Sequence, residues 1–286
     1  SSTGLVMDED PLFVDALNGD YTLFANSPCV NSGDANYANV IQDTDGTISD
    51  MGYFSHLNDY TGENGWYIDA INGSNISGVG TGEQGKPYQA ITSAFNFLPN
   101  INQEINVLPG TYNEQLIWPQ LDGISLIGLG ASIDTPIIID AGGNGRVIDM
   151  NYVQNTVIEG VVIRGGFLDD GSDGAGISCT FCGLELTSVI IEDNHIDTQV
   201  EAGCSSVFGG GGYAFSSNIN FQDVTIQNNS INLANNCSWG DIGGGFYFEG
   251  SNVIINNMNV LDNYSDGYSG GLHFNEGTLE MDNVYF

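Results

Sequence analysis

Positively charged residues are almost absent from this sequence of 286 residues. Lys86, Arg146 and Arg164 stand against 36 aspartates and glutamates, and the formal net charge is -33. Nucleic acid and anionic lipid surfaces bind through cationic side chains that neutralise phosphates, so neither is expected as a partner. So much negative charge repels itself, and high salt, bound Ca²⁺ or an acidic medium would compensate for it. All three favour an extracellular or cell-surface location; a merely soluble acidic surface is the alternative.

Long apolar runs and catalytic signatures are missing as well. No apolar run exceeds a few residues, so membrane insertion is not expected. No basic, apolar leader opens the chain, so any secretion signal is expected upstream or already removed. GxSxG, P-loop and HExxH motifs are absent, and His56, His195 and His273 are scattered. Carboxylate pairs carry no information in so acidic a chain, and the sequence predicts that the protein is not an enzyme.

A short pattern recurs four times in the last hundred residues. It reads LELTSVIIEDN, INFQDVTIQNN, VIINNMNVLDN and LEMDNVYF, with equivalent positions at Val189, Val224, Met258 and Val284. A glycine-rich phrase accompanies it and ends at Cys179, Phe215, Phe248 and Phe274. Each period thus holds two strand signals separated by Gly, Asn and Asp turns, with no helical period between them. This pattern predicts a solenoid in which each coil buries its apolar side against its neighbours.

The alternating phrases resemble the right-handed parallel β-helix proteins of the pectate-lyase-like superfamily. More narrowly, they are similar to the Gly/Asn-rich β-helix modules of large secreted bacterial surface proteins. The resemblance implies an all-β fold, with a right-handed parallel β-helix over residues 65–286 and an open C-terminal end. It also implies a short capping helix near residues 87–98, where Ile91, Ala94, Phe95 and Leu98 recur at helical spacing. It implies little about activity, because the fold hosts lyases, hydrolases, adhesins and inert fibres.

Residues 1–64 are expected to form a small β-rich segment and a linker. The run from Asp10 to Asp34 resembles the segment that closes a β-helix module in these surface proteins, although here it precedes the repeats. Because the last repeat stops in mid-strand at Phe286, we expect this segment to complete a neighbouring copy by strand complementation. The residues expected to do so are Asp10, Pro11, Leu12, Phe13, Val14, Tyr21 and Leu23. A tandem-repeat polypeptide and a truncated chain are the alternatives.

The five cysteines and the repeated aromatic residues are expected to be structural. Cys204 and Cys237 each lie nine residues before an equivalent position of successive coils. Coils stack at about 4.8 Å, within the roughly 4.4–6.8 Å between disulfide Cα atoms, which predicts a Cys204–Cys237 disulfide. Cys179 and Cys182 could bridge or remain buried thiols, and Cys29 is left over.

Stacked side chains are expected inside the coils and at one turn. Phe215, Phe248 and Phe274 are predicted to form an aromatic ladder in the core, a reading favoured over a sugar-binding platform. The pairs Asn228-Asn229 and Asp262-Asn263 suggest an asparagine ladder at a turn, where stacked amides satisfy one another's hydrogen bonds.

One short motif suggests a metal ion. Asp43, Asp45 and Gly46, with Asp50, resemble the DxDG calcium loops of extracellular families. Alternating carboxylates can both turn inward while glycine permits the sharp turn, so these residues could bind Ca²⁺. A solvated turn is the alternative reading.

The sequence favours an extracellular structural or adhesive unit that assembles end to end with copies of itself into a surface fibre. Arg146 is expected to pair with a local carboxylate such as Asp149, and Arg164 to neutralise acidic loops rather than abstract a proton. The alternative is a carbohydrate-binding or polysaccharide-degrading β-helix acting on a neutral or cationic glycan, and a passive spacer is a third reading. A face that concentrates convergent acids around a groove would favour the enzyme.

Overall fold

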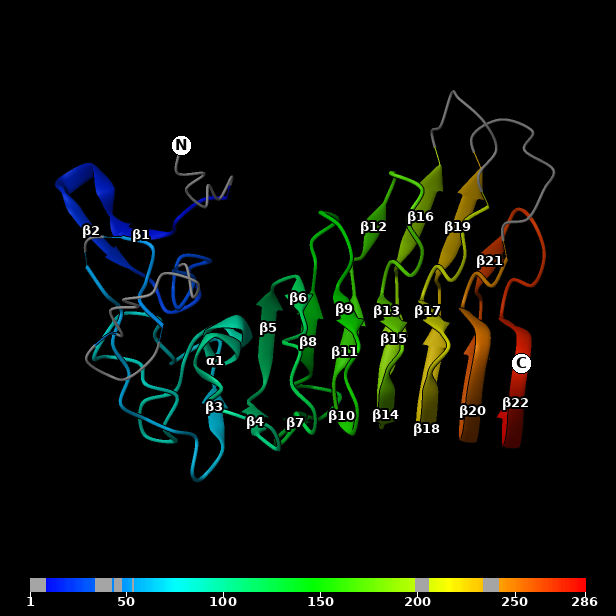
Figure 1. Ribbon diagram of the computed structural model, residues 1–286. Coiled ribbons are helices and arrows are strands. Elements are labelled where there is room, and N and C mark those ends of the chain that lie inside the picture. The colour runs from blue at the N-terminus through cyan, green and yellow to red at the C-terminus, as the bar shows by residue number, and fades with distance from the viewer. Residues whose placement is uncertain (1–8, 34–42, 44–47, 53, 199–205, 234–241) are drawn as a thin grey trace. The chain divides into compact units, whose positions relative to one another are not determined.

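The computed structural model describes residues 9–33, 43, 48–52, 54–198, 206–233 and 242–286. The chain divides into two compact units, Ser1–Asn106 and Val107–Phe286, which are described separately (Figure 1). The protein is mainly β, with a parallel sheet of sixteen strands and one short α-helix among the described residues. None of the helices in that part of the chain is long and apolar enough to cross a bilayer.

The N-terminal unit begins with an antiparallel hairpin. β1 (Phe13–Asp15) pairs with β2 (Asp20–Leu23), and the 3-10 turn η1 (Ala16–Asn18) joins them. Gly19 ends the turn with φ of 85°, a conformation that costs glycine little. Most of the segment predicted to complete a neighbouring copy lies in this hairpin, where Leu23 is buried within its own unit. Donation of the segment to another copy stays a prediction.

The predicted helix is confirmed within this unit, although it is shorter than expected. α1 (Ile91–Phe97) starts after Ala90, whose backbone is extended, and Pro99 follows soon after its end. Ile91, Ala94 and Phe97 form its buried face. Near it lies β3 (Trp66–Ile68), and β4 (Glu104–Val107) ends at the junction of the two units. The division between the two units falls after Asn106, beyond the helix, whereas the sequence predicted a boundary after residue 64.

The C-terminal unit consists of parallel strands. Its first half comprises β5 (Gly110–Asn113), β6 (Leu116–Ile117), β7 (Ser125–Gly128), β8 (Ile137–Asp140), β9 (Ile148–Asn151), β10 (Thr156–Glu159), β11 (Val162–Arg164) and β12 (Phe167–Leu168). Its second half comprises β13 (Ile177–Thr180), β14 (Gly183–Thr187), β15 (Ile190–Glu192), β16 (His195–Thr198), β17 (Gly212–Phe215), β18 (Asn218–Gln227), β19 (Ser230–Leu233), β20 (Phe246–Leu261), β21 (Tyr264–Ser265) and β22 (Leu272–Tyr285). A separate sheet has the order β12-β16-β19-β21.

Strand register follows the sequence repeat. β10, β14, β18, β20 and β22 pair in that order, and Val224, Met258 and Val284 are partners as the repeat predicts. Side chains alternate between the two faces of a strand, so each inward position stacks on the equivalent position of the next strand. Leu184, Ile219 and Val253 form one such buried row.

The predicted phenylalanine ladder is wrong at its first member. Phe248 and Phe274 are partners, but Phe215 lies opposite Glu249, and Ala214 takes the place beside Phe248. The reason is a fourth glycine, Gly212, which occupies the position of Phe246 in the next strand. A Cβ atom on Gly212 would lie 2.1 Å from the Phe246 ring, so the missing side chain makes room for that ring.

The asparagine ladder is present and is longer than predicted. The side-chain amides of Asn194, Asn229 and Asn263 join in sequence, with N···O distances of 3.0 and 2.9 Å. The side-chain oxygens of Asn229 and Asn263 also accept the backbone N–H of the preceding asparagine in the ladder. Asn194 and Asn229 are fully buried, so these bonds satisfy polar groups that water cannot reach. The ladder fixes the turn at the same place in three successive layers.

Candidate functional site

A groove of about 530 Å³ runs across five strands of the C-terminal unit, which lie side by side in Figure 1. It crosses β10, β14, β18, β20 and β22, so at the usual strand spacing it extends for about 19 Å. The residues that form it are Gln154, Asn155, Thr156, Val157, Gly183, Leu184, Glu185, Asn218, Ile219, Asn220, Asn252, Val253, Ile254, Thr278 and Glu280. We call it the amide groove, because asparagine and glutamine contribute much of its polar lining.

Two rows of aligned positions shape the amide groove. The first row consists of outward-facing residues in register: Val157, Glu185, Asn220, Ile254 and Glu280. The second row lies two residues earlier on each strand and contains Gly183, Asn218, Asn252 and Thr278. The buried apolar residues between these rows face the core, so the alternation that builds the core also places polar groups in the groove.

Hydrogen bonds link the second row along the groove. The Thr278 hydroxyl donates to the Asn252 amide oxygen at 2.8 Å, and the Asn252 amide donates to the Asn218 oxygen at 2.9 Å. This direction leaves the Asn218 NH₂ group as a donor at the end of the relay. At the other end of the groove Gly183 makes room for Gln154, whose oxygen would lie 2.7 Å from a Cβ atom there.

One buried polar atom of the first row has no hydrogen-bond partner among the described residues. The side-chain oxygen of Asn220 is buried and accepts no hydrogen bond within the described part of the chain. Unpaired buried acceptors are rare, because each forfeits the hydrogen bond it made with water. Asn220 lies in the middle of the groove, between Glu185 and Ile254 in the row.

The two carboxylates of the groove are far apart. Glu185 lies on β14 and Glu280 on β22, which are three strand steps from one another. At the spacing of a sheet the separation is about 14 Å, whereas paired carboxylates that hydrolyse glycosides lie about 5–9.5 Å apart. The arrangement suits hydrogen bonding to a ligand better than glycoside hydrolysis by these two groups.

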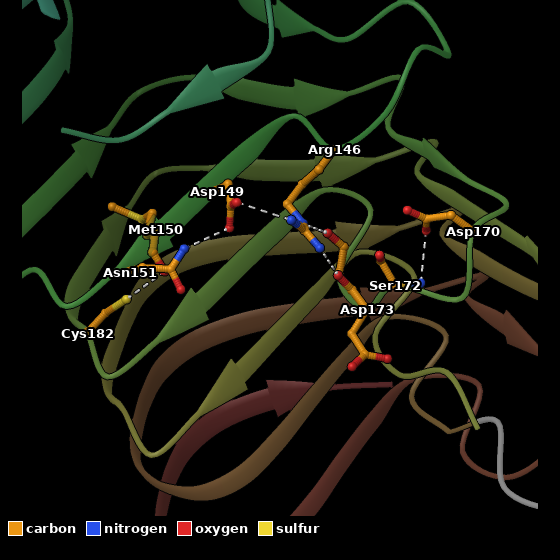
Figure 2. A network of polar contacts seen from close by, with 9 residues as sticks. Arg146, Asp149, Met150, Asn151, Asp170, Ser172, Asp173 and Cys182 are labelled. Carbon is orange, nitrogen blue, oxygen red and sulfur yellow. Dashed lines mark hydrogen bonds and ion pairs between the residues drawn. The ribbon is translucent and has the colours of Figure 1, made fainter. Parts of the chain in front are cut away.

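A second cluster of polar residues surrounds Asp173, as Figure 2 shows. The carboxylate of Asp173 accepts the backbone N–H of Phe208 at 2.8 Å. Arg146 donates to the backbone oxygens of Asp173 and Gly174 and forms an ion pair with Asp149 at 3.3 Å. Burial raises the pKa of Asp173 to about 6. The hydrogen bond from the Phe208 N–H and the nearby charge of Arg146 both lower this pKa, but by less than burial raises it.

Tyrosine side chains adjoin this cluster. The Tyr213 hydroxyl donates to Glu249 at 2.9 Å, and burial followed by this bond raises the pKa of Tyr213. The Tyr213 ring stacks on Tyr247, which in turn stacks on His273. Since Tyr247 is only 4% exposed and lies between Tyr213 and His273, its ring faces are not open to a ligand. The structure assigns it to packing between layers.

The predicted pairing of both arginines with acidic neighbours is confirmed. Arg146 pairs with Asp149, the carboxylate named from the sequence. Arg164 pairs with Asp140 at 2.9 Å, so its guanidinium neutralises an acidic neighbour.

The predicted calcium residues are only partly described. Asp45 lies outside the described residues. Asp50 accepts backbone N–H groups from Asn31 at 2.7 Å and His56 at 2.6 Å, while Asp43 accepts the N–H of Asp50 at 3.2 Å. Burial raises the pKa of Asp50 in spite of these two bonds. The structure thus gives Asp50 a role as a backbone acceptor, and calcium binding stays a prediction.

The predicted Cys204–Cys237 disulfide lies outside the described residues. Cys29, Cys179 and Cys182 are buried free thiols, which is one of the two states considered for the CTFC pair. The Cys182 thiol donates to the backbone oxygen of Met150 at 3.4 Å (Figure 2).

Sequence reasoning missed the amide groove. Its signal was present, because Asn218, Asn220 and Asn252 alternate with inward-facing apolar residues in consecutive repeats. These positions are outward-facing by period, but the pattern alone does not say that the surface around them is concave.

No protein-family model matches the sequence, and no curated protein matches it. Among solved structures, the chain is distantly similar to one titled as the selenomethionine derivative of GH136 lacto-N-biosidase from Eubacterium ramulus. The identity is 7% and the TM-score is 0.33, over 77% of this chain and 67% of that one.

Proposed function

We propose that this chain is an extracellular structural and adhesive unit with a right-handed parallel β-helix fold. The parallel pairing, the aligned apolar rows and the asparagine ladder support a solenoid of successive coils. The extreme acidity supports a location outside the cytoplasm, where salt or divalent cations reduce repulsion. In this role the unit extends a surface fibre by adding layers along the axis of the solenoid.

The observation that carries the proposal is the exposed apolar row of β22. In β20 the inward-facing Val253 and Ile255 are each 1% exposed. Their partners in β22 are Leu279, which is 37% exposed, and Met281, which is 53% exposed. Within the described residues β22 pairs only with β20, so its other edge offers unpaired N–H and C=O groups.

A further layer would cover this row and use the free hydrogen-bonding groups together. An added strand in parallel register would bury Leu279 and Met281 as β22 now buries Val253 and Ile255. Strand addition of this kind gains affinity from the main chain and specificity from alternate side chains. We assign the added strand to a second copy of this chain.

Electron microscopy combined with denaturing gels tests the proposal. We expect the purified protein to form filaments that dissolve, on boiling with reductant, to a band near the 30.4 kDa of one chain. Met281→Lys should abolish filaments because it places a charge in the row that must be covered. Ile133→Lys, which changes an exposed residue of the same unit, should leave them unchanged. Particles of single chains from the unmodified protein would refute assembly.

A further inference from the structure

We propose that the amide groove is a binding site for a linear, uncharged polysaccharide. The inference names a ligand class for the adhesive role but does not depend on assembly, because all the residues of the groove belong to one chain. Three features of the groove carry it: the chemistry of the lining, its repeat along the sheet, and the unpaired acceptor at its centre.

The lining matches hydroxyl groups in both directions. Sugar hydroxyls donate and accept hydrogen bonds, and a side-chain amide offers two donors and an acceptor within one group. Gln154, Asn155, Asn218, Asn220 and Asn252 provide five such amides, and Thr278 adds a hydroxyl. The apolar Val157 and Ile254 provide surface for the C–H faces of sugar rings, and Ile254 is 45% exposed.

The charge of the groove lining determines which class of polymer the groove can bind. The lining contains no lysine, arginine or histidine, and its charged members are Glu185 and Glu280. Carboxylates accept hydroxyl hydrogen bonds but repel uronic acids, sulfated glycans and phosphodiesters. With only two acids against seven neutral polar side chains, the groove offers a cationic polymer little compensation for the loss of its hydration. An uncharged chain is therefore the best match.

The geometry favours a polymer over a small molecule. Each of the five strands contributes at least one polar side chain, so polar groups recur about every 4.8 Å along a groove of about 19 Å. A linear glycan presents hydroxyls repeatedly along its axis and can meet several layers at once. The Thr278–Asn252–Asn218 relay pre-orients the amides, so less side-chain freedom is lost on binding.

The unpaired oxygen of Asn220 points to an incoming donor. It is buried, no described group donates to it, and it lies between the two carboxylates of the row. Rotation of its amide toward the groove would let a ligand hydroxyl supply the missing hydrogen bond. The NH₂ group of Asn218, which donates no hydrogen bond within the described part of the chain, would donate to the same ligand from the neighbouring row.

Affinity electrophoresis in native gels tests the inference, because the charge of -33 gives the protein high mobility. Gels would contain hydroxyethyl cellulose, galactomannan, mixed-linkage β-glucan or arabinoxylan as uncharged probes, with polygalacturonate as a polyanion and soluble chitosan as a polycation. The single-chain fraction would be isolated by size exclusion first. We expect retardation by at least one uncharged polymer and none by polygalacturonate.

Two groove variants and one control localise the binding. Asn218→Ala combined with Asn252→Ala removes two amides and should raise the dissociation constant about tenfold. Asn220→Trp should block the groove sterically and abolish retardation. Asn259→Ala changes an exposed asparagine of β20 outside the groove and should bind as the unmodified protein does. Thermal unfolding of each variant verifies that it is folded.

Three results would overturn the inference. They are no retardation by any uncharged polymer, retardation by chitosan alone, and full binding by both folded groove variants. Binding by a single-chain fraction that forms no filaments would leave this inference intact while refuting assembly, so the two failures are distinguishable.

Discussion

Asp173 should make the protein less stable at neutral pH than in mild acid. Burial holds the pKa of its carboxyl at about 6 in the folded chain, against an ordinary value of 3.8. A folded-state pKa above the unfolded one means that the folded chain binds the proton more tightly. The free energy of unfolding therefore rises as the pH falls from 6 toward 4 and Asp173 takes up a proton. Above pH 6 the carboxylate is ionised, and its burial destabilises the folded chain by the full amount.

The substitution Asp173→Asn measures this penalty. Its side-chain oxygen can still accept the Phe208 N–H, which lies 2.8 Å from the present carboxylate, but it cannot ionise. A difference of about two pKa units corresponds to about 3 kcal/mol, and relaxation around the site should reduce the observed value to about 1–3 kcal/mol. We expect the variant to be more stable than the unmodified protein at pH 7.5 by that amount. The gain should disappear near pH 4.

Urea unfolding followed by tryptophan fluorescence at pH 4, 5, 6 and 7.5 gives the comparison. The difference between variant and unmodified protein cancels the many other carboxylates that titrate over the same range. Asp170→Asn is the matched control from the same loop (Figure 2). The hydrogen bond from the Ser172 N–H lowers the pKa of Asp170, because it stabilises the charged carboxylate. Replacing that carboxylate with an amide should therefore lower the free energy of unfolding at neutral pH. A stability difference for Asp173→Asn that is independent of pH, or negative at pH 7.5, would refute the reasoning.

Three further substitutions test structural roles. Asp50→Ala should cost about 2–4 kcal/mol, because two backbone N–H groups lose their acceptor; thermal melts with Ca²⁺ and with EGTA should show equal losses, and a loss seen only with Ca²⁺ would instead support a metal site. Asn229→Ala should lower the free energy of unfolding in urea by about 2–4 kcal/mol, because the buried ladder loses a member. The exposed control Asn259→Ala should lower it by less than about 0.5 kcal/mol, and equal losses would show that the ladder does not stabilise the fold. Gly212→Ala should lower the free energy of unfolding by about 1–3 kcal/mol, because the added methyl group overlaps the Phe246 ring. In a double-mutant cycle Phe246→Leu should relieve part of that loss, whereas additive losses would refute the overlap.

Periodicity predicts the inward-facing rows well, because a period of two residues leaves few choices. The alignment of Val224, Met258 and Val284 follows directly from it. Counting glycines is less reliable. Four glycines precede Tyr213 and three precede Phe246, and the sequence does not say at which end the extra one belongs. The ring of Phe246 determines the register, because it occupies the space that a side chain at Gly212 would fill.

Concavity and burial depend on neighbours that are distant in the sequence. In the LDDGSDG loop, Asp169, Asp170 and Asp173 look alike, yet Asp173 is the one that receives the N–H of Phe208. That donor lies on a later layer, and no local pattern identifies it. The same holds for the amide groove. Its asparagines can be recognised in the sequence, but whether they line one concave surface depends on the lateral position of each strand.

The two proposals meet at β22, which supplies Thr278 and Glu280 to the amide groove and the exposed Leu279 between them. A strand added to this edge would cover Leu279 and extend both rows of the groove by one layer. Filaments should therefore bind a long polysaccharide more tightly than single chains do, whereas an oligosaccharide shorter than one groove should bind both equally. Isothermal titration of filaments and of the single-chain fraction distinguishes these cases. Equal affinity for the long polymer in both forms would show that the added layer does not continue the groove.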